Sequence, residues 1–264
     1  MKDTPLVSVI MPAYNAAPFI SEAINSVITQ TYSHWELFVI DDASTDATVE
    51  LINSFTAGDP RISLIKNPVN KGPGFSRNLG IENAEGAFIA FLDADDMWLP
   101  QKLEIQIDFM REHNLKMTFS SYYLQKENQD KPFAIVEALP ILTYSKLLKS
   151  NYVGNLTGIY DVSQTGKVFA PVMRKRQDWA LWLTILKNIG KTRVVIQPLA
   201  VYRVRQESLS QNKSSLISYN FRIYKDYLKF GFLKSCALMG RFLWEHFLVK
   251  SRQVKKLDKG GELL

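Results

Sequence analysis

Residues 7–42 read VSVIMPAYNAAPFISEAINSVITQTYSHWELFVIDD, and this stretch decides the fold. It places a short apolar run, Val7–Pro12, before an amphipathic segment, Pro18–Thr29, and a second apolar run, Glu36–Asp41. Short runs rich in Val and Ile are typical of buried strands, whereas apolar residues at spacings of three and four predict a helix. The order strand, helix, strand is typical of a parallel sheet with helices on both faces.

The same alternation continues to about residue 123 and returns in a weaker form beyond it. Further strands are predicted at Ile62–Lys66, Ala87–Leu92, Met117–Tyr123, Leu156–Asp161 and Arg193–Tyr202. Further helices are predicted at Ala47–Phe55, Phe75–Ala84, Pro100–Glu112, Trp179–Asn188 and through residues 214–250. We therefore predict an α/β fold, a Rossmann-like and mostly parallel sheet with helices on both faces, followed by a C-terminal helical appendage.

The composition excludes several classes of protein. With 264 residues, 46% hydrophobic and 22% charged, the chain is globular, neither disordered nor collagen-like. The single cysteine, Cys236, forms no internal disulfide, which fits a reducing compartment. The three histidines stand far apart, so any metal is expected on carboxylates. No run approaches the ~18 uncharged apolar residues of a membrane span, and a soluble or peripheral protein is expected.

Carboxylates gather after the second and fourth predicted strands, within residues 41–46 and 93–96. Two of them, Asp46 and Asp96, are explained by the helices that follow, because Asp is a good helix cap. That explanation does not cover Asp42, Asp93 and Asp95. Carboxylates crowded at one sheet edge repel each other unless a cation or hydrogen-bond donors satisfy them.

The Asp-x-Asp at residues 93–95 offers the hard oxygen ligands that Mg²⁺ or Mn²⁺ takes, usually with substrate phosphates. The sequence contains neither a P-loop nor a dinucleotide-binding glycine motif after the first strand. Its Gly72-Pro73-Gly74, with Lys71 and Arg77, would let backbone and cations approach a diphosphate. A turn before a helix explains those glycines equally well.

These residues stand in four linked motifs: Val7–Asn15, Ile40–Asp46, Asn70–Asn78 and Phe91–Asp96. In this order and spacing they resemble the family 2 inverting glycosyltransferases, which include bacterial enzymes of O-antigen, capsule and teichuronic acid synthesis. The resemblance covers about residues 5–110, and a looser one continues to about 210. It implies a GT-A catalytic domain over residues 1–213, with a donor half of about 5–123 and an acceptor half of about 124–213. Residues 214–264 would then form a basic, aromatic, helical C-terminal region.

The resemblance also implies a nucleotide-sugar donor, for which a UDP-hexose is expected. By motif position, Pro12, Ala13 and Tyr14 would line the nucleotide pocket, and Asp42 would accept the uracil N–H. Some relatives have Thr or Ser where Pro12 stands, and proline has no N–H to donate there.

Diphosphate and metal contacts follow from the same resemblance. Arg77 would face the diphosphate, Asp93 and Ala94 would lie near the sugar and ribose, and Asp95 would be the principal ligand of Mn²⁺ or Mg²⁺. Arg205 stands where relatives often have a histidine near the donor phosphates. Arg205 is equally well explained as a surface charge.

An inverting transfer needs a base for the acceptor hydroxyl. The resemblance assigns it to Asp178, in Gln177-Asp178-Trp179-Ala180-Leu181-Trp182. The alternative for Asp178 is a helix cap. Trp179 and Trp182 are expected either to border the acceptor sugar or to belong to the core.

The C-terminal region carries the excess positive charge. Residues 220–256 hold nine Lys or Arg against two carboxylates, a net of +7, whereas the rest of the chain sums to −1. Interleaved aromatics suit an anionic membrane surface, and the alternative is a helical pair with a solvated basic face.

The predicted activity is metal-dependent sugar transfer to a polyprenyl-diphosphate-linked acceptor in surface polysaccharide synthesis. It is expected in the bacterial cytoplasm, peripheral at the inner face of the membrane. A sugar nucleotidyltransferase and a non-catalytic nucleotide-sugar-binding module are the alternatives; a nucleic-acid partner is not expected, because the carboxylates repel phosphates.

Overall fold

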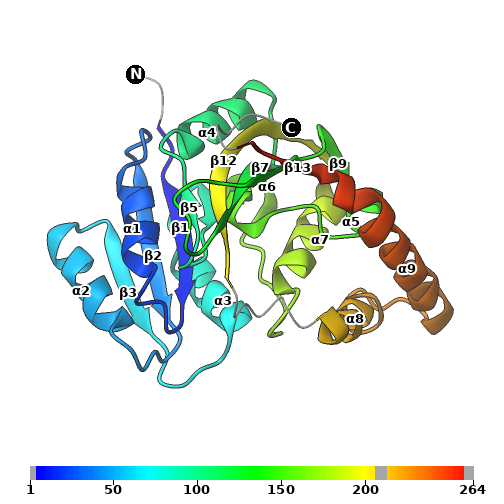
Figure 1. Ribbon diagram of the computed structural model, residues 1–264, viewed down its shortest axis with the longest axis horizontal. Helices are drawn as coiled ribbons and strands as arrows, with labels where there is room; N and C mark the ends of the chain where they lie inside the picture. The colour runs from blue at the N-terminus through cyan, green and yellow to red at the C-terminus, as the bar shows by residue number, and fades with distance from the viewer. Residues whose placement is uncertain (1–3, 206–212, 259–264) are drawn as a thin grey trace.

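A computed structural model describes residues 4–205 and 213–258 (Figure 1). Its main sheet has six strands in the order β3-β2-β1-β4-β10-β6. The first four run parallel, and β10 is antiparallel to both of its neighbours. Their bounds are β1 Val7–Ala13, β2 Trp35–Asp41, β3 Ile62–Lys66, β4 Phe88–Phe91, β6 Met117–Thr118 and β10 Ile159–Asp161. The predicted doubly covered, mostly parallel sheet is confirmed.

Helices cover both faces of this sheet because β1 is apolar on both sides. Val9 and Met11 pack in one buried cluster with Ile20 of α1, whereas Ile10 packs in the other with Ile81 of α3. This alternation follows from successive strand side chains pointing to opposite faces. The helices of this half are α1 Ile20–Ile28, α2 Thr48–Gly58, α3 Pro73–Asn83 and α4 Lys102–Glu112.

A second sheet, β13-β8-β7-β12-β5, is built mainly by the later half of the chain. Its strands are β5 Met97–Trp98, β7 Ser120–Lys126, β8 Ala134–Val136, β12 Val195–Val204 and β13 Val254–Lys256. A two-stranded sheet pairs β9 Ile141–Thr143 with β11 Lys191–Arg193, and short helices α5 Tyr144–Leu147 and α6 Val162–Thr165 lie nearby in sequence. The C-terminal region is therefore tied back to the body, because β13 pairs antiparallel with β8.

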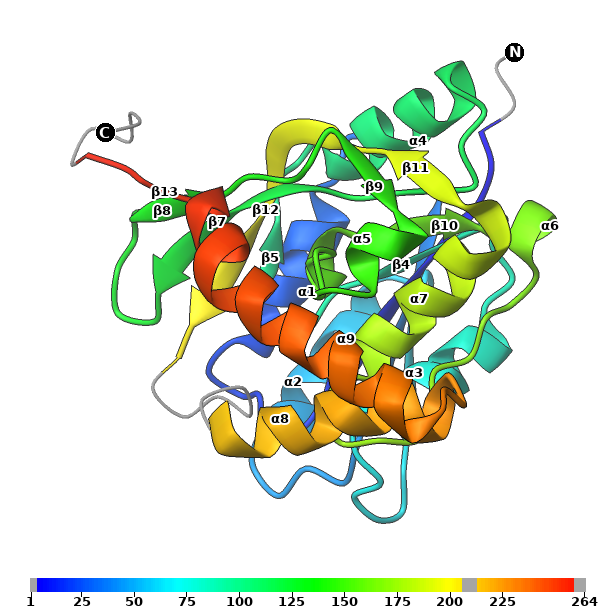
Figure 2. The same ribbon diagram turned by 90° about the vertical axis from the view of Figure 1, so that its right-hand side faces the viewer.

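The C-terminal helices pack on α7, which spans Gln177–Ile189. They are α8 Lys213–Arg222, a π-helical turn Ile223–Tyr227, α9 Phe232–Trp244 and a second π-helical turn Glu245–Val249. Figure 2 shows α9 crossing in front of α7 and α8 as the outermost layer of this side. Tyr224 and Phe242 meet the Trp179 ring at centroid distances of 5.7 and 5.9 Å. No helix in the described ranges is both long enough and apolar enough to cross a bilayer.

Candidate active site

The carboxyl ends of β1, β2 and β4 meet at one edge of the main sheet. The Asp42 N–H donates to the Ala13 carbonyl oxygen at 2.8 Å, which joins the loops that follow β1 and β2. Asn15 and Ala43, in these two loops, have positive φ angles of 46° and 64°, a conformation that costs energy for residues other than glycine. The backbone therefore forms strained turns at the carboxyl ends of β1 and β2. This is the edge at which parallel sheets bind their ligands.

Asp42 is 3% exposed and its carboxylate accepts three hydrogen bonds from the segment 67–72. Oδ1 accepts from Asn67 Nδ2 at 2.7 Å and from the Lys71 N–H at 3.0 Å, and Oδ2 accepts from the Gly72 N–H at 2.7 Å. Asp42 thus fixes the loop that precedes α3. The expected uracil contact would use acceptor capacity that remains on Oδ2.

Arg77 lies beneath the same edge and is 5% exposed. Its Nη2 pairs with Asp93 Oδ1. Its Nε and Nη1 find no hydrogen-bond partner in the part of the chain that the structure describes. A buried guanidinium with unused donors favours an anionic or oxygen-rich ligand, because leaving such donors unpaired is costly.

The Asp-x-Asp forms an ion pair with Arg205, the residue that follows β12. Arg205 Nη1 lies 3.1 Å from Asp95 Oδ2, and the Arg205 guanidinium stands over the Phe19 ring at 4.6 Å. Arg203, which is 7% exposed, donates its backbone N–H to Asp96 Oδ1 at 2.9 Å. The structure thus brings Arg205 to the carboxylates, although its expected phosphate contact stays a prediction.

Crowding shifts the acidity of these carboxyls. Burial and the neighbouring Asp93 charge raise the pKa of Asp95, and Arg205 only partly offsets this. Burial and the charges of Asp95 and Asp93 raise the pKa of Asp96 well above its usual range. A hard divalent cation fits such an oxygen set because it would offset the repulsion. The described residues contain no cluster of three or more His, Cys, Asp or Glu able to hold a metal, so substrate oxygens would have to complete its shell.

The segment 171–177 joins the donor side of the site to α7. A β-carbon added at Gly74, in the first turn of α3, would lie 3.1 Å from the Pro171 carbonyl oxygen and 3.0 Å from that of Met173. It would also approach Gln177 Cγ to 3.3 Å. Gly74 therefore permits a close approach that brings the amino ends of α3 and α7 together, and with them the neighbourhoods of Arg77 and Asp178.

Asp178 lies in the first turn of α7 and is not its cap. The helix is preceded by Arg176 in the left-handed conformation, without a side-chain cap. Asp178 Oδ2 accepts a hydrogen bond from Asn151 Nδ2 at 2.9 Å, and the Asn151 carbonyl oxygen accepts one from Lys250 Nζ. Burial and the nearby Arg176 lower the pKa of Lys250 to about 8, although Asp178 favours its charged form.

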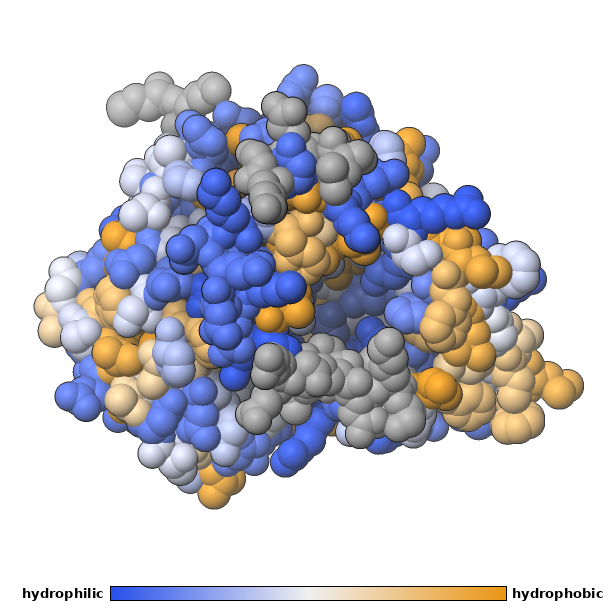
Figure 3. All heavy atoms as spheres, in the orientation of Figure 1, coloured by the Kyte–Doolittle hydropathy of each residue, from blue (hydrophilic) through white to orange (hydrophobic). Residues whose placement is uncertain are grey.

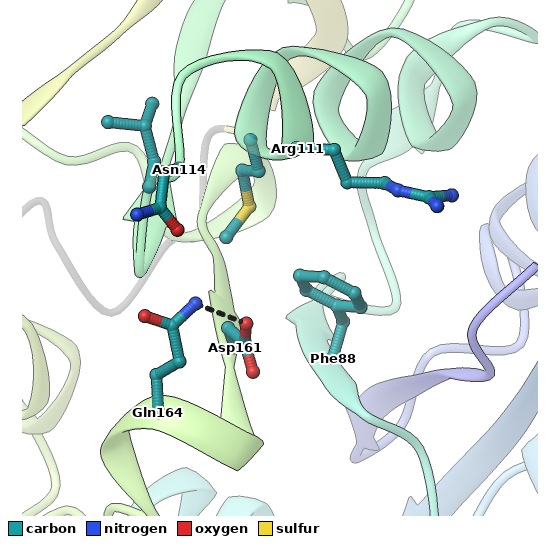
Figure 4. A pocket seen from close by; sticks show the side chains of 7 residues that line it. Phe88, Arg111, Asn114, Asp161 and Gln164 are labelled. Carbon is teal, nitrogen blue, oxygen red and sulfur yellow. Dashed lines mark hydrogen bonds between the residues drawn. The ribbon is translucent and has the colours of Figure 1, made fainter. Parts of the chain in front are cut away.

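Figure 3 shows this face of the molecule hollowed between its left-hand part and the C-terminal helices on the right. A second hollow, of about 270 Å³, lies at the opposite edge of the sheet beside Phe88, where β4 begins (Figure 4). Its carboxylate, Asp161, is already engaged, because Gln164 Nε2 donates to Asp161 Oδ2 at 2.8 Å and the Ser163 N–H donates to Asp161 Oδ1 at 2.8 Å. The carboxyl-end site is therefore the candidate active site.

Comparisons with known proteins agree with this geometry. A family model described as glycosyl transferase family 2 matches residues 8–161, more than half of the chain. The chain belongs to glycosyl transferase family 2. It is 36% identical over 231 residues to a putative teichuronic acid biosynthesis glycosyltransferase of Bacillus subtilis, covering 88% of this chain and 92% of that one.

A second family 2 relative is an Escherichia coli enzyme named UDP-Glc:alpha-D-GlcNAc-diphosphoundecaprenol beta-1,3-glucosyltransferase. It is 37% identical over 228 residues, which cover 86% of this chain and 88% of that one. Among solved structures, Staphylococcus aureus TarS 1–349 in complex with UDP-GlcNAc aligns with a TM-score of 0.70 at 21% identity, covering 92% of this chain and 73% of that one. The protein is a glycosyltransferase with the GT-A fold.

The structure corrects one expectation for this family 2 site. Trp179 and Trp182 are both 0% exposed, so neither borders an acceptor sugar. Trp179 donates its indole N–H to the Leu147 carbonyl oxygen at 2.9 Å, and Trp182 packs edge-on against Phe91 at a centroid distance of 5.7 Å. They are buried because α7 packs on both the main sheet and the C-terminal helices.

The remaining expected residues line the same edge. Pro12 and Ala13 end β1 and are buried, whereas Tyr14 is 51% exposed. Ala94, between the two carboxylates, is buried. Their contacts with a nucleotide stay predictions. Sequence reasoning missed Asn151, since nothing in the polar, weakly patterned stretch around it signals a contact with Asp178.

Proposed function

We propose that this enzyme transfers a hexosyl group from a UDP-hexose, with inversion, to a sugar hydroxyl on a lipid-diphosphate acceptor in surface polysaccharide synthesis. One observation carries the proposal: the buried Arg77 guanidinium pairs with Asp93 through Nη2 and keeps Nε and Nη1 without a partner among the described residues. A nucleoside diphosphate sugar offers the phosphate, ribose and sugar oxygens that such donors need.

The names of relatives and structural neighbours support the donor and acceptor classes. The Escherichia coli relative is named for UDP-glucose and for a diphosphoundecaprenol-linked acceptor, and TarS was crystallised with UDP-GlcNAc. The identity to a teichuronic acid enzyme supports surface polysaccharide synthesis. UDP-glucose is therefore the first donor to test.

Inversion requires a base on the side of the acceptor, and Asp178 is the residue we assign to it. Asn151 holds Oδ2, and Oδ1 is assigned to accept the proton of the acceptor hydroxyl. As that proton leaves, the acceptor oxygen bonds to the anomeric carbon from the face opposite the diphosphate. The bond from the anomeric carbon to the phosphate oxygen breaks, and UDP departs with its electron pair.

The donor side of the site stabilises the departing group. Arg77 and Arg205 supply fixed positive charge beside Asp93 and Asp95, so little reorganisation is needed as charge develops. Asp95, with Asp93, would hold Mg²⁺ or Mn²⁺, which when bound neutralises charge accumulating on the diphosphate. A mannosyltransferase of Pyrobaculum calidifontis, 18% identical and aligned with a TM-score of 0.65, was solved with GDP-Man and Mn²⁺.

The enzyme is further proposed to be peripheral at an anionic membrane. The inner side of α9 is buried, whereas the other side of α9 and of the π-helical turn after it carries exposed apolar residues that we call the outer stripe. It consists of seven exposed residues: Leu233, Cys236, Ala237, Gly240, Trp244, Phe247 and Leu248. Figure 3 shows hydrophobic surface gathered over α9. Exposed Lys234 and Arg241 flank it, and this combination favours insertion at an anionic lipid interface.

A donor panel tests the activity. Purified enzyme is incubated with a short-chain GlcNAc-diphosphate-lipid, Mn²⁺ or Mg²⁺, and UDP-, GDP- or CDP-linked hexoses, and products are weighed by mass spectrometry. Transfer from a UDP-hexose is expected, together with its loss in Asp95→Asn. Asp108→Asn, an exposed carboxyl on α4, is the matched control and should retain transfer. Transfer from GDP- or CDP-hexoses alone would contradict the proposal.

Vesicle cosedimentation tests the membrane proposal. Binding to vesicles containing phosphatidylglycerol should exceed binding to neutral vesicles and weaken with salt. Trp244→Ser with Phe247→Ser should release the protein, whereas the exposed Ile196→Ser on β12 should not. Equal binding by both variants, or no preference for anionic vesicles at low salt, would refute this role of the outer stripe.

A further inference from the structure

A hollow of about 380 Å³ opens where α9 ends. It is lined by Lys149, Arg241, Trp244 and Glu245. Lys149 follows α5 by two residues, and the other three come from the last turn of α9 and the residue after it. The hollow is thus built by the acceptor half together with the C-terminal region, away from the nucleotide-side cluster of Arg77 and Asp93.

The charge of this hollow is positive because its one carboxylate is already neutralised. Glu245 is 5% exposed, and its Oε1 accepts from the Tyr152 hydroxyl at 2.5 Å and from Lys146 Nζ. Burial alone would raise the pKa of Glu245, but these two hydrogen bonds lower it below its usual range, so the carboxylate is ionised and paired. Because Lys146 pairs with Glu245, Lys149 and Arg241 leave the hollow with a net positive charge, although the Lys149 charge also acts on Glu245.

Two consecutive residues, Asn151 and Tyr152, connect the hollow to the assigned base, Asp178. Tyr152 reaches Glu245 at the wall of the hollow, and Asn151, its neighbour in the chain, donates to Asp178 Oδ2. Lys250 Nζ, one helical turn beyond Glu245, donates to the Asn151 carbonyl oxygen. An anion between Lys149 and Arg241 would therefore lie near the residues that hold Asp178.

The hollow also borders the outer stripe, through Trp244. Trp244 is 66% exposed and belongs both to the hollow and to that apolar surface. Trp244 thus joins the apolar surface to the cationic hollow, and Glu245, Tyr152 and Asn151 connect the hollow to the assigned base. A lipid-diphosphate-linked sugar has the same order of chemistry: hydrocarbon chain, phosphates and reactive hydroxyl.

We propose that Lys149 and Arg241 bind the phosphate groups of the lipid-linked acceptor in this hollow, with Trp244 against the first part of its hydrocarbon chain. The proposal rests on the proposed function, because it names the part of the acceptor that anchors the transfer. It explains why an enzyme with nucleotide phosphates at Arg77 needs a second cationic site. Such contacts are charge-assisted and act on the acceptor alone.

Two acceptors that differ only in the anion test the site. One is GlcNAc-diphosphate on a short alkyl chain, and the other is the neutral alkyl glycoside of GlcNAc. The double variant Lys149→Gln/Arg241→Gln should raise KM for the diphosphate acceptor on the order of 10–100-fold. Its KM for the neutral acceptor and for UDP-hexose should stay at the parent values. A matched double variant, Lys225→Gln/Lys229→Gln, removes two exposed cations from the same region and should change neither KM.

The possible outcomes distinguish a failure of the proposed phosphate site from a failure of the proposed function. An unchanged KM for the diphosphate acceptor, or an equal rise for both acceptors, would overturn the proposed site. An equal rise in the Lys225/Lys229 control would also overturn it, because general surface charge would then be responsible. Competition by phosphatidylglycerol vesicles that equals competition by the diphosphate-lipid would assign the hollow to membrane lipid instead. Absence of transfer by the parent enzyme to either acceptor would be a failure of the proposed function itself.

Discussion

Replacement of Asp42 by asparagine is expected to loosen the loop that precedes α3, residues 67–72, as well as to weaken nucleotide binding. The native carboxylate accepts from Asn67 and Lys71 on one oxygen and from Gly72 on the other. An asparagine has one oxygen and one NH₂ group at these positions. Whichever way the amide turns, at least one buried donor faces another donor.

The magnitude follows from the hydrogen bonds that the substitution breaks. One charge-assisted hydrogen bond contributes about 1.5–3 kcal/mol, and a buried donor without an acceptor costs a further 1–3 kcal/mol or so. Asp42→Asn should therefore lower the free energy of unfolding by about 3–5 kcal/mol, measured by urea unfolding. For a chain of this size the melting temperature should fall by roughly 10 °C.

A surface carboxyl provides the control for this measurement. Asp108 on α4 is exposed, and Asp108→Asn should cost under about 1 kcal/mol of the free energy of unfolding. UDP binding is then measured by calorimetry on both variants. If Asp42→Asn unfolds at the parent urea concentration, the carboxylate does not fix the loop, and the assignment of these hydrogen bonds is refuted.

Three further changes have defined outcomes. Gly158→Ala would place a β-carbon 2.2 Å from Trp182 Cζ2, so overpacking should lower the free energy of unfolding by about 3 kcal/mol. An unchanged urea midpoint would contradict this contact. Arg77→Lys should weaken UDP binding on the order of 10–100-fold by calorimetry, because one ammonium cannot replace the guanidinium fork, and parent affinity would remove Arg77 from the donor site. Lys250, whose pKa burial lowers to about 8, is protonated in the unfolded but not the folded chain between about pH 8 and 10.5. As pH rises through that window, the free energy of unfolding of the parent should increase by up to about 3 kcal/mol relative to that of Lys250→Gln. If the two proteins showed the same pH dependence in urea unfolding, the lowered pKa of Lys250 would be contradicted.

The strands β1 and β2 were predictable because most of their residues are buried, on both faces of the sheet. Val7–Pro12 and Glu36–Asp41 are continuous apolar runs between polar loops, and the structure extends each by one residue. The carboxylate edge followed from the same pattern, since parallel strands place their carboxyl ends together. Local sequence was sufficient to predict the structure wherever a residue's role depends on its neighbours along the chain.

Roles decided by distant segments could not be predicted in this way. Trp182 has the same residue type and helical position whether it faces a sugar or the core, and only the packing of α7 against Phe91 decides between them. The strand Val254–Lys256 is short and basic, and it exists because β8 offers it an edge more than a hundred residues earlier. The hydrogen bond from Asn151 to Asp178 likewise depends on how the acceptor half folds onto α7.

The turnover of Asp178→Asn tests the central claim most directly. Transfer from UDP-hexose to the diphosphate-linked acceptor is followed by product formation, and UDP affinity is measured on the same preparation. The account predicts a loss of about 10²–10⁴-fold in turnover with UDP affinity retained, because the amide preserves the shape but cannot accept the hydroxyl proton. The parent product should carry a β linkage formed from the α-linked donor. Transfer by Asp178→Asn at near-parent rate, or an α linkage in the parent product, would contradict the assignment of Asp178 as the base of an inverting transfer.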